Sequence, residues 1–142
     1  MIVHAHPVHN TLSNVEYLVA CPESGEALAI DPWDGQGLAS LAEDKGLKIG
    51  QILNTHAHHD HIRGNEDLQR LTGARVLCHK GALGQIPGAQ EGLVDGDFVE
   101  MGSVRLRVMD TPGHTMSHIC LLREEGPPAL FSGDTLFNAG AG

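Results

Sequence analysis

Four histidines and one aspartate stand within six consecutive positions of this chain, in the segment THAHHDHI at positions 55–62. Neutral imidazole and carboxylate are side-chain ligands that zinc, iron and manganese bind in proteins. A histidine cluster of this density has no role in packing a hydrophobic core. The segment therefore predicts a metal-binding loop, which follows an apolar strand expected over residues 49–54.

The spacing within the segment divides the candidate ligands into two groups. His56 and His58 are two residues apart, so in an extended segment their side chains point to the same side and can hold one ion. Asp60 and His61 begin the following turn and can face a second ion. His59 points away from its neighbours, and we predict that it faces solvent or supports the site from outside the ligand set.

Two further candidate ligands lie on loops later in the chain. His114 is part of the turn sequence TPGHT at positions 111–115, and Asp134 ends an apolar strand in FSGDT at positions 131–135. We predict that His114 joins His56 and His58 on the first ion. Asp134 has two carboxylate oxygens, so we predict that it bridges both ions.

Such a ligand set points to hydrolytic chemistry. Two ions about 3.5 to 4 Å apart can share a hydroxide, polarise a carbonyl and stabilise the oxyanion that forms on attack. Water on such an ion reaches a pKa of about 7, so a metal-bound hydroxide exists at neutral pH. We expect two divalent metal ions, with zinc first and iron or manganese as alternatives. Asp60 is both a ligand of the second ion and the candidate catalytic residue.

Four residues near the candidate ligands are expected to support them by hydrogen bonds. Asp31 ends an apolar strand, and we predict that it orients the ligand loop without binding metal itself. Thr55 and Thr115 have either this supporting role or a simple turn role. His118 has either this role or a purely structural one.

Three histidines near the N-terminus form a second pattern. His4 and His6 alternate, which places them on one face of an extended segment, and His9 follows. No carboxylate or cysteine accompanies them in the sequence. We therefore predict that they do not bind a metal ion.

Strands and helices alternate early in the chain and strands dominate later, which predicts the α/β class. The pattern of apolar residues and turns predicts a hairpin of residues 15–21 and 27–30, a helix carrying Leu38 and Leu41 that ends near Gly46, and a helix capped by Asn65 that ends near Gly73. Further strands are expected over residues 74–78, 98–101, 104–109, 118–122 and 129–132, and residues 81–96 are expected to be irregular. All candidate ligands then lie on loops at strand ends, where chemistry usually sits.

Composition limits the function classes. The chain has 142 residues, which is at most one ordinary domain, and a formal net charge of -9. That charge argues against nucleic-acid binding and against attraction to anionic membranes, and we expect neither partner. The three cysteines, Cys21, Cys78 and Cys120, are far apart and contain no CxxC pair. With no signal sequence visible, they predict buried thiols in a cytoplasmic protein.

The motifs THxHxDH, TPGHT and SGDTLF, in that order, resemble the metallo-β-lactamase superfamily. Together with Asp31-Pro32 and His118-Ile119-Cys120, they are most similar to glyoxalase II, or hydroxyacylglutathione hydrolase. The resemblance implies an αββα sandwich with the metals at one edge. It places His56, His58 and His114 on one ion, Asp60 and His61 on the other, and Asp134 between them. The implied reaction is hydrolysis of a small-molecule thioester, S-2-hydroxyacylglutathione, which releases glutathione and a 2-hydroxy acid.

The end of the chain departs from this pattern. The family has one more histidine ligand beyond the bridging aspartate, and residues 135–142 contain no histidine. We therefore expect residues 1–142 to form a metallo-β-lactamase-like domain that lacks its C-terminal part. An incomplete sandwich exposes apolar surface, so we expect the chain to associate with copies of itself as a homo-oligomer. We also expect the chain alone to be poorly active as a thioesterase.

Three other functions remain open from the sequence. One is a persulfide dioxygenase, which resembles the same motifs and holds one iron, here by His56, His114 and Asp134. A second is a related lactonase-type hydrolase; β-lactamase activity is disfavoured, because Asp134 stands where those enzymes commonly use cysteine. The third is an inactive metal-binding fragment.

Overall fold

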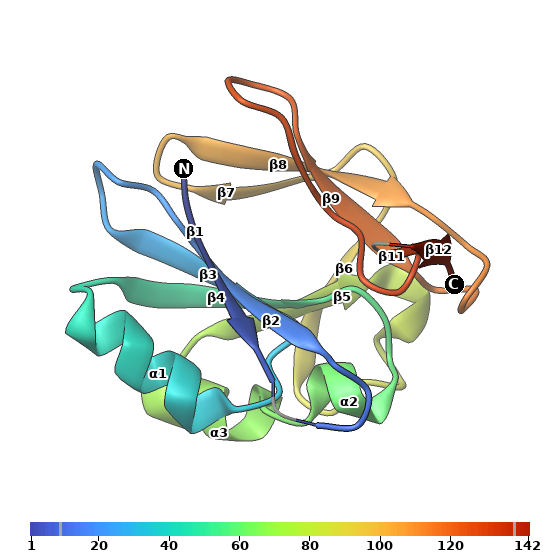
Figure 1. Ribbon diagram of the computed structural model, residues 1–142, viewed down its shortest axis with the longest axis horizontal. Helices are drawn as coiled ribbons and strands as arrows, with labels where there is room; N and C mark the ends of the chain where they lie inside the picture. The colour runs from blue at the N-terminus through green and yellow to red at the C-terminus, as the bar shows by residue number, and fades with distance from the viewer. Residues whose placement is uncertain (9, 138) are drawn as a thin grey trace.

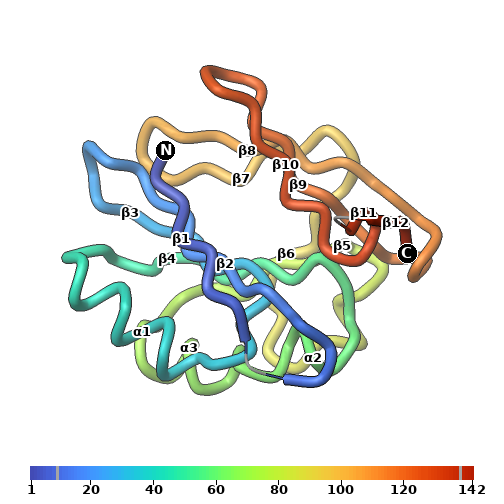
Figure 2. Tube along the Cα trace, in the orientation of Figure 1, coloured from blue at the N-terminus to red at the C-terminus, as the bar shows by residue number. Residues whose placement is uncertain are grey.

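Two β-sheets stacked face to face form the centre of the protein, and two helices cover the outer side of one of them (Figure 1). The computed structural model describes residues 1–8, 10–137 and 139–142. The larger sheet has six strands in the order β1-β2-β3-β4-β5-β6, and the smaller has four in the order β10-β9-β8-β7. A two-stranded hairpin, β11-β12, lies beside the smaller sheet near the C-terminus (Figure 2).

The six-stranded sheet is antiparallel from β1 to β3 and parallel from β3 to β6. Its strands are β1 (Ile2–Pro7), β2 (Val15–Ala20), β3 (Glu26–Ile30), β4 (Lys48–Asn54), β5 (Arg75–His79) and β6 (Ala89–Leu93). The predicted β2–β3 hairpin and the predicted strands at β4 and β5 are confirmed. Strand β1 was not predicted from the sequence, and β6 is a correction to the irregular segment expected over residues 81–96.

The four-stranded sheet is antiparallel throughout. Its strands are β7 (Phe98–Met101), β8 (Val104–Asp110), β9 (Ile119–Arg123) and β10 (Ala129–Phe131), followed by β11 (Leu136–Phe137) and β12 (Gly140–Ala141). All four predicted strands of this sheet are confirmed. The β7–β8 connection turns at Gly102, where φ is +54°, a conformation that glycine adopts without strain.

Two longer helices and two short ones connect the strands: α1 (Gly35–Asp44), α2 (His59–Ile62), α3 (Asn65–Thr72) and the 3₁₀ turn Lys80–Ala82. Asp34 caps α1 by accepting a hydrogen bond from the Gly37 amide at 3.0 Å. Asn65 does not cap α3 as predicted, since it is the first helical residue and Gly64 occupies the cap position. Its side-chain amide instead pairs with that of buried Asn54, through bonds of 2.7 and 3.1 Å.

Strand β3 shows how the sequence builds two cores, one on each face of the larger sheet. Leu28 and Ile30 point toward the smaller sheet and belong to the core between the two sheets. Ala27 and Ala29 point the other way, where their small side chains pack in the core beneath α1 and α3. The resulting order is helix, sheet, sheet, which confirms the α/β class and the incomplete αββα sandwich; in the described ranges no helix covers the outer face of the β7–β10 sheet.

The three cysteines are buried and unpaired, as expected. No helix in the described part of the chain is long and apolar enough to cross a membrane.

Candidate metal centre

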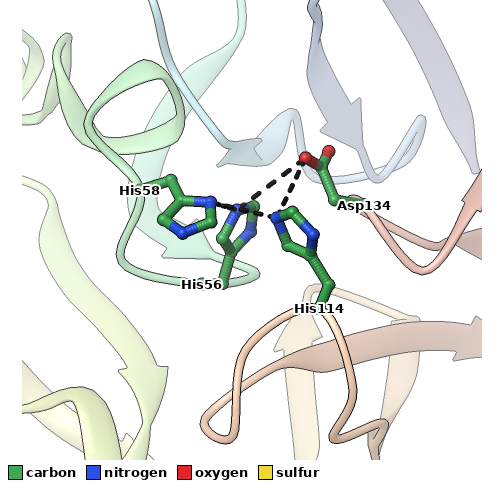
Figure 3. A group of neighbouring side chains, drawn as sticks. All are labelled: His56, His58, His114 and Asp134. Atoms are coloured by element: carbon green, nitrogen blue, oxygen red, sulfur yellow. Dashed lines mark hydrogen bonds and ion pairs between the residues drawn. The ribbon is translucent and has the colours of Figure 1, made fainter. Parts of the chain in front are cut away.

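The candidate ligands come together from three loops. The first follows β4 and continues into α2, the second joins β8 to β9, and the third joins β10 to β11. These loops carry residues 55–61, His114 and Asp134 respectively. The side chains of His56, His58, His114 and Asp134 converge on one point (Figure 3), with donor atoms all within 4.8 Å of one another.

Three imidazoles form what we call the three-histidine half-site: His56, His58 and His114. Nδ1 of His58 lies 3.0 Å from Nε2 of His56 and 3.0 Å from Nε2 of His114. His58 thus faces the centre with Nδ1, whereas the other two use Nε2. Imidazole nitrogens at this spacing are a donor set that fits a divalent transition metal once they are unprotonated.

Asp60 and His61 form the second group, the aspartate–histidine half-site. Oδ2 of Asp60 lies 3.5 Å from Nε2 of His61. Both residues are on the short helix α2, which places their side chains beside the ligand loop.

Asp134 joins the two half-sites, because each of its oxygens faces a different one. Oδ2 lies 3.3 Å from Nε2 of His114 and 4.0 Å from Nε2 of His56. Oδ1 lies 3.3 Å from Nε2 of His61. The geometry fits a carboxylate shared by two ions.

Asp31 holds the ligand loop with both carboxylate oxygens. Its Oδ1 accepts the Thr55 amide at 2.7 Å, and Oδ2 accepts the Thr55 hydroxyl at 2.6 Å. Oδ2 also accepts from Nδ1 of His61 at 2.9 Å. Because Nδ1 of His61 carries this proton, its Nε2 is the nitrogen left to face the site. Asp31 has a φ of +50°, an uncommon conformation for a residue other than glycine.

Thr55 fixes the orientation of His56 in the same way. Its hydroxyl donates to Asp31 and lies 3.1 Å from Nδ1 of His56, so the Nδ1 proton of His56 points to Thr55. Nε2 of His56 is then a free lone pair aimed into the three-histidine half-site.

His118 supports Asp134 through the backbone. The Asp134 amide donates to Nε2 of His118 at 3.2 Å, and Nδ1 of His118 lies 2.9 Å from the Thr111 hydroxyl. Gly133 lets the chain pass here: its φ is +47°, and a Cβ would lie 2.5 Å from the Thr55 hydroxyl and 2.8 Å from Nε2 of His118. A side chain at this position would push Asp134 away from the histidines.

Electrostatics differ sharply between the half-sites. Burial, reinforced by the nearby charge of His61, lowers the pKa of His56 to about 4. Burial also lowers the pKa of His61, but hydrogen bonds to Asp134 and Asp31 outweigh it and raise that pKa to about 10. The hydrogen bond from His61 in turn lowers the pKa of Asp134. In the polypeptide alone, His56 is therefore neutral and His61 is a cation between two carboxylates.

A cavity of about 590 Å³ opens beside the aspartate–histidine half-site. Its lining includes Asp60, His61 and Asp134 together with apolar side chains such as Tyr17 and Phe131. A cavity that combines apolar walls with a few converging polar groups is a typical small-molecule site.

In the described part of the chain, Thr115 and His59 make none of the hydrogen bonds that tie the other predicted residues to the candidate ligands. Among the described residues, the buried hydroxyl of Thr115 has no hydrogen-bond partner, so no bond ties it to a ligand. His59 is exposed on α2. The ligand and supporting roles assigned to all these residues stay predictions.

Sequence reasoning missed Asn14, whose amide lies against Asp60 and His61. It also missed a carboxylate near the N-terminal histidines: Nδ1 of His6 lies 2.6 Å from buried Glu16, which also accepts from the Trp33 and Asp34 amides. No motif could reveal either contact, because the partners are distant in sequence: pairing of β1 with β2 brings His6 to Glu16, and the loop before β2 meets α2 at Asp60. His9 lies outside the described residues.

Known proteins that are similar to this chain have the metallo-β-lactamase fold. The profile of the Metallo-beta-lactamase superfamily matches residues 17–142. A curated relative, the hydroxyacylglutathione hydrolase of Polaromonas sp., is 52% identical over 100% of this chain and 54% of its own length. The chain spans about half the length of the curated relatives it matches.

Two solved structures are similar over nearly the whole chain. The crystal structure of ETHE1 from Myxococcus xanthus matches with a TM-score of 0.86 and 28% identity, covering 100% of this chain and 61% of that one. The crystal structure of TTHA1623 in a di-iron-bound form matches with a TM-score of 0.76 and 30% identity, covering 96% of this chain and 75% of that one.

Proposed function

Because the chain belongs to the metallo-β-lactamase superfamily, we propose that it carries the two-metal site of a hydrolase that cleaves S-2-hydroxyacylglutathione thioesters. The observation that carries the proposal is Asp134, whose two oxygens face the two half-sites separately. The names of the curated relatives support the thioester substrate.

In this proposal, each residue of the site either holds a metal ion, orients a ligand or lines the substrate cavity. His56, His58 and His114 would hold one ion, Asp60 and His61 the other, and Asp134 both. When bound, the ions supply an activated water and polarise the thioester carbonyl. Asp31 and Thr55 hold His61 and His56 with the correct nitrogen toward the site. The cavity beside Asp60 offers room for the substrate.

Oxygen and nitrogen ligands of this kind accept zinc, iron or manganese, and we propose zinc first. A similar solved structure, TTHA1623, is in a di-iron-bound form, which supports the proposal of two ions. A cytoplasmic location and self-association are part of the same proposal.

The test measures metal content and thioester cleavage together. Protein purified without added metal is analysed for bound zinc, iron and manganese, and release of free thiol from lactoylglutathione is followed before and after reconstitution. We expect two ions per chain and a hydrolysis rate, however slow, that Asp134→Ala removes and His59→Ala leaves unchanged. One iron per chain, with dioxygen consumed in the presence of a persulfide, would replace the hydrolase by the dioxygenase. Two ions with no thioester cleavage would contradict the substrate.

A further inference from the structure

The loop between β1 and β2 reaches the metal centre although it contains none of the candidate ligands. Asn14, at its end, donates a hydrogen bond from Nδ2 to Oδ2 of Asp60 at 2.9 Å. The same Nδ2 lies 3.4 Å from Nε2 of His61. Both atoms belong to the aspartate–histidine half-site, and Asn14 also lines the cavity beside it.

A second amide fixes the direction in which Asn14 points. Nδ2 of Asn10 donates to Oδ1 of Asn14 at 2.7 Å, so the oxygen of Asn14 is engaged and its NH₂ group must face Asp60. Oδ1 of Asn10 accepts from the Leu12 and Asn14 amides at 3.1 and 3.3 Å. The Val8 amide donates to the Asn14 carbonyl at 2.8 Å, which closes the loop on itself.

In the described ranges, the Asp60 carboxylate accepts fewer hydrogen bonds than the Asp31 carboxylate, so it depends more on the hydrogen bond from Asn14. Among the described residues, the side-chain partners of its carboxylate are Asn14 and His61. Asp31, by comparison, accepts three hydrogen bonds from Thr55 and His61. Without Asn14, the one remaining side-chain contact of the Asp60 carboxylate within the described part of the chain is the 3.5 Å contact to His61, so the carboxylate can rotate away from His61 more easily.

We propose that Asn14 is a positioning residue that holds Asp60 in its metal-binding orientation and so sets the affinity of the aspartate–histidine half-site for its ion. The inference rests on the two-metal site proposed above, but not on its substrate. Outer partners of this kind change metal affinity by about 10- to 100-fold. Asn14 makes no contact with the three-histidine half-site, so the effect falls on one ion only.

The experiment titrates Zn²⁺ into metal-free protein in competition with a chromophoric chelator, and repeats the titration with Co²⁺ to follow each site by its absorption spectrum. We expect Asn14→Ala to weaken the second ion about 10- to 100-fold and to leave the first within about twofold of the parent protein. The first ion in the same molecule serves as the internal control, because misfolding would weaken both.

Asn10→Ala is the matched control, since it alters the same loop and the same residue type without removing the donor to Asp60. We expect a smaller loss than for Asn14→Ala. Equal losses in the two variants would mean that loop order, not hydrogen-bond donation to Asp60, controls the site. Unchanged second-ion affinity in Asn14→Ala, or equal weakening of both ions, would overturn the proposal. A parent protein that binds a single ion would instead overturn the two-metal site.

Discussion

His56 and His61 are both buried and only five residues apart, but their pKa values are shifted in opposite directions. Their relative exposures are 0% and 6%. His56 lies among other imidazoles, and burial lowers its pKa to about 4. His61 lies between Asp31 and Asp134, which outweigh burial and raise its pKa to about 10. The comparison shows that neighbouring carboxylates, rather than depth, decide the charge of a buried histidine here.

The two half-sites therefore differ in whether their buried histidine must lose a proton before it can bind a metal ion. In the three-histidine half-site His56 is already neutral, so an ion can bind its Nε2 without displacing a proton. The aspartate–histidine half-site must first release the proton of His61, because only unprotonated imidazole binds a metal. Four measurements can sharpen or break this contrast.

Asp134→Ala has the largest expected effect, because Asp134 faces both half-sites. We expect both ions to weaken, each by more than the roughly 100-fold that loss of an outer partner costs. Elemental analysis after dialysis measures the remaining stoichiometry, with His59→Ala as the exposed control. A variant that keeps one tightly bound ion would show that Asp134 serves one half-site only.

Single-ligand variants come next, because each should empty one half-site. His58→Ala removes a nitrogen that lies 3.0 Å from both His56 and His114, and His61→Ala removes the only imidazole of the other group. Co²⁺ titration should show loss of one spectral component in each variant, and a different one in each. Loss of the same component in both would mean that the half-sites are not separate.

Asp31→Asn should produce a smaller effect confined to the aspartate–histidine half-site. An amide NH₂ in place of Oδ2 cannot accept the Nδ1 proton of His61, so the ring would shift that proton to Nε2, the nitrogen that faces the site. We expect about 10- to 100-fold weaker binding of the second ion by chelator competition. Equal weakening of the first ion would show that the variant disturbs the whole loop through Thr55.

Changing the pH should have the smallest effect. We expect the affinity of the aspartate–histidine half-site for its ion to rise about tenfold per pH unit. His61 in metal-free protein is protonated below its pKa of about 10, so binding of the second ion between pH 7 and 9 should release about one proton. His56 is already neutral there and contributes none. Calorimetry in buffers of different ionisation enthalpy measures the release. An enthalpy for the second ion that does not depend on the buffer would contradict a cationic His61.

Local patterns predicted most of the strands and the grouping of the candidate ligands. Apolar and β-branched runs predicted β2 and β3, and turn residues placed the hairpins, because both signals lie within a few residues. The two-residue spacing of His56 and His58 was enough to predict that they share a target. The bridging position of Asp134 came from its two oxygens and its place at a strand end.

The missed features depend on partners that are distant in sequence. Strand β6, AQEGL, has no β-branched residue, and pairing with β5 alone makes it a strand. Asn65 was expected to cap α3, but its amide is used by buried Asn54, since an unpaired amide there would cost more than a missing cap. Asn14 reaches Asp60 across 46 positions of sequence, where the loop before β2 meets α2.

The three loops that meet at Asp134 also give the metal centre an order of assembly. During synthesis, the segment with His56, His58 and His61 leaves the ribosome before His114 and Asp134 do. Ions bound by the early histidines alone would be weakly held, because the remaining donors are missing. Tight loading must therefore wait until β10 has paired with β9, and from that point each ion ties the late sheet to the early one. Metal then favours the assembled pair of sheets by mass action, so its supply should govern how much newly made protein survives.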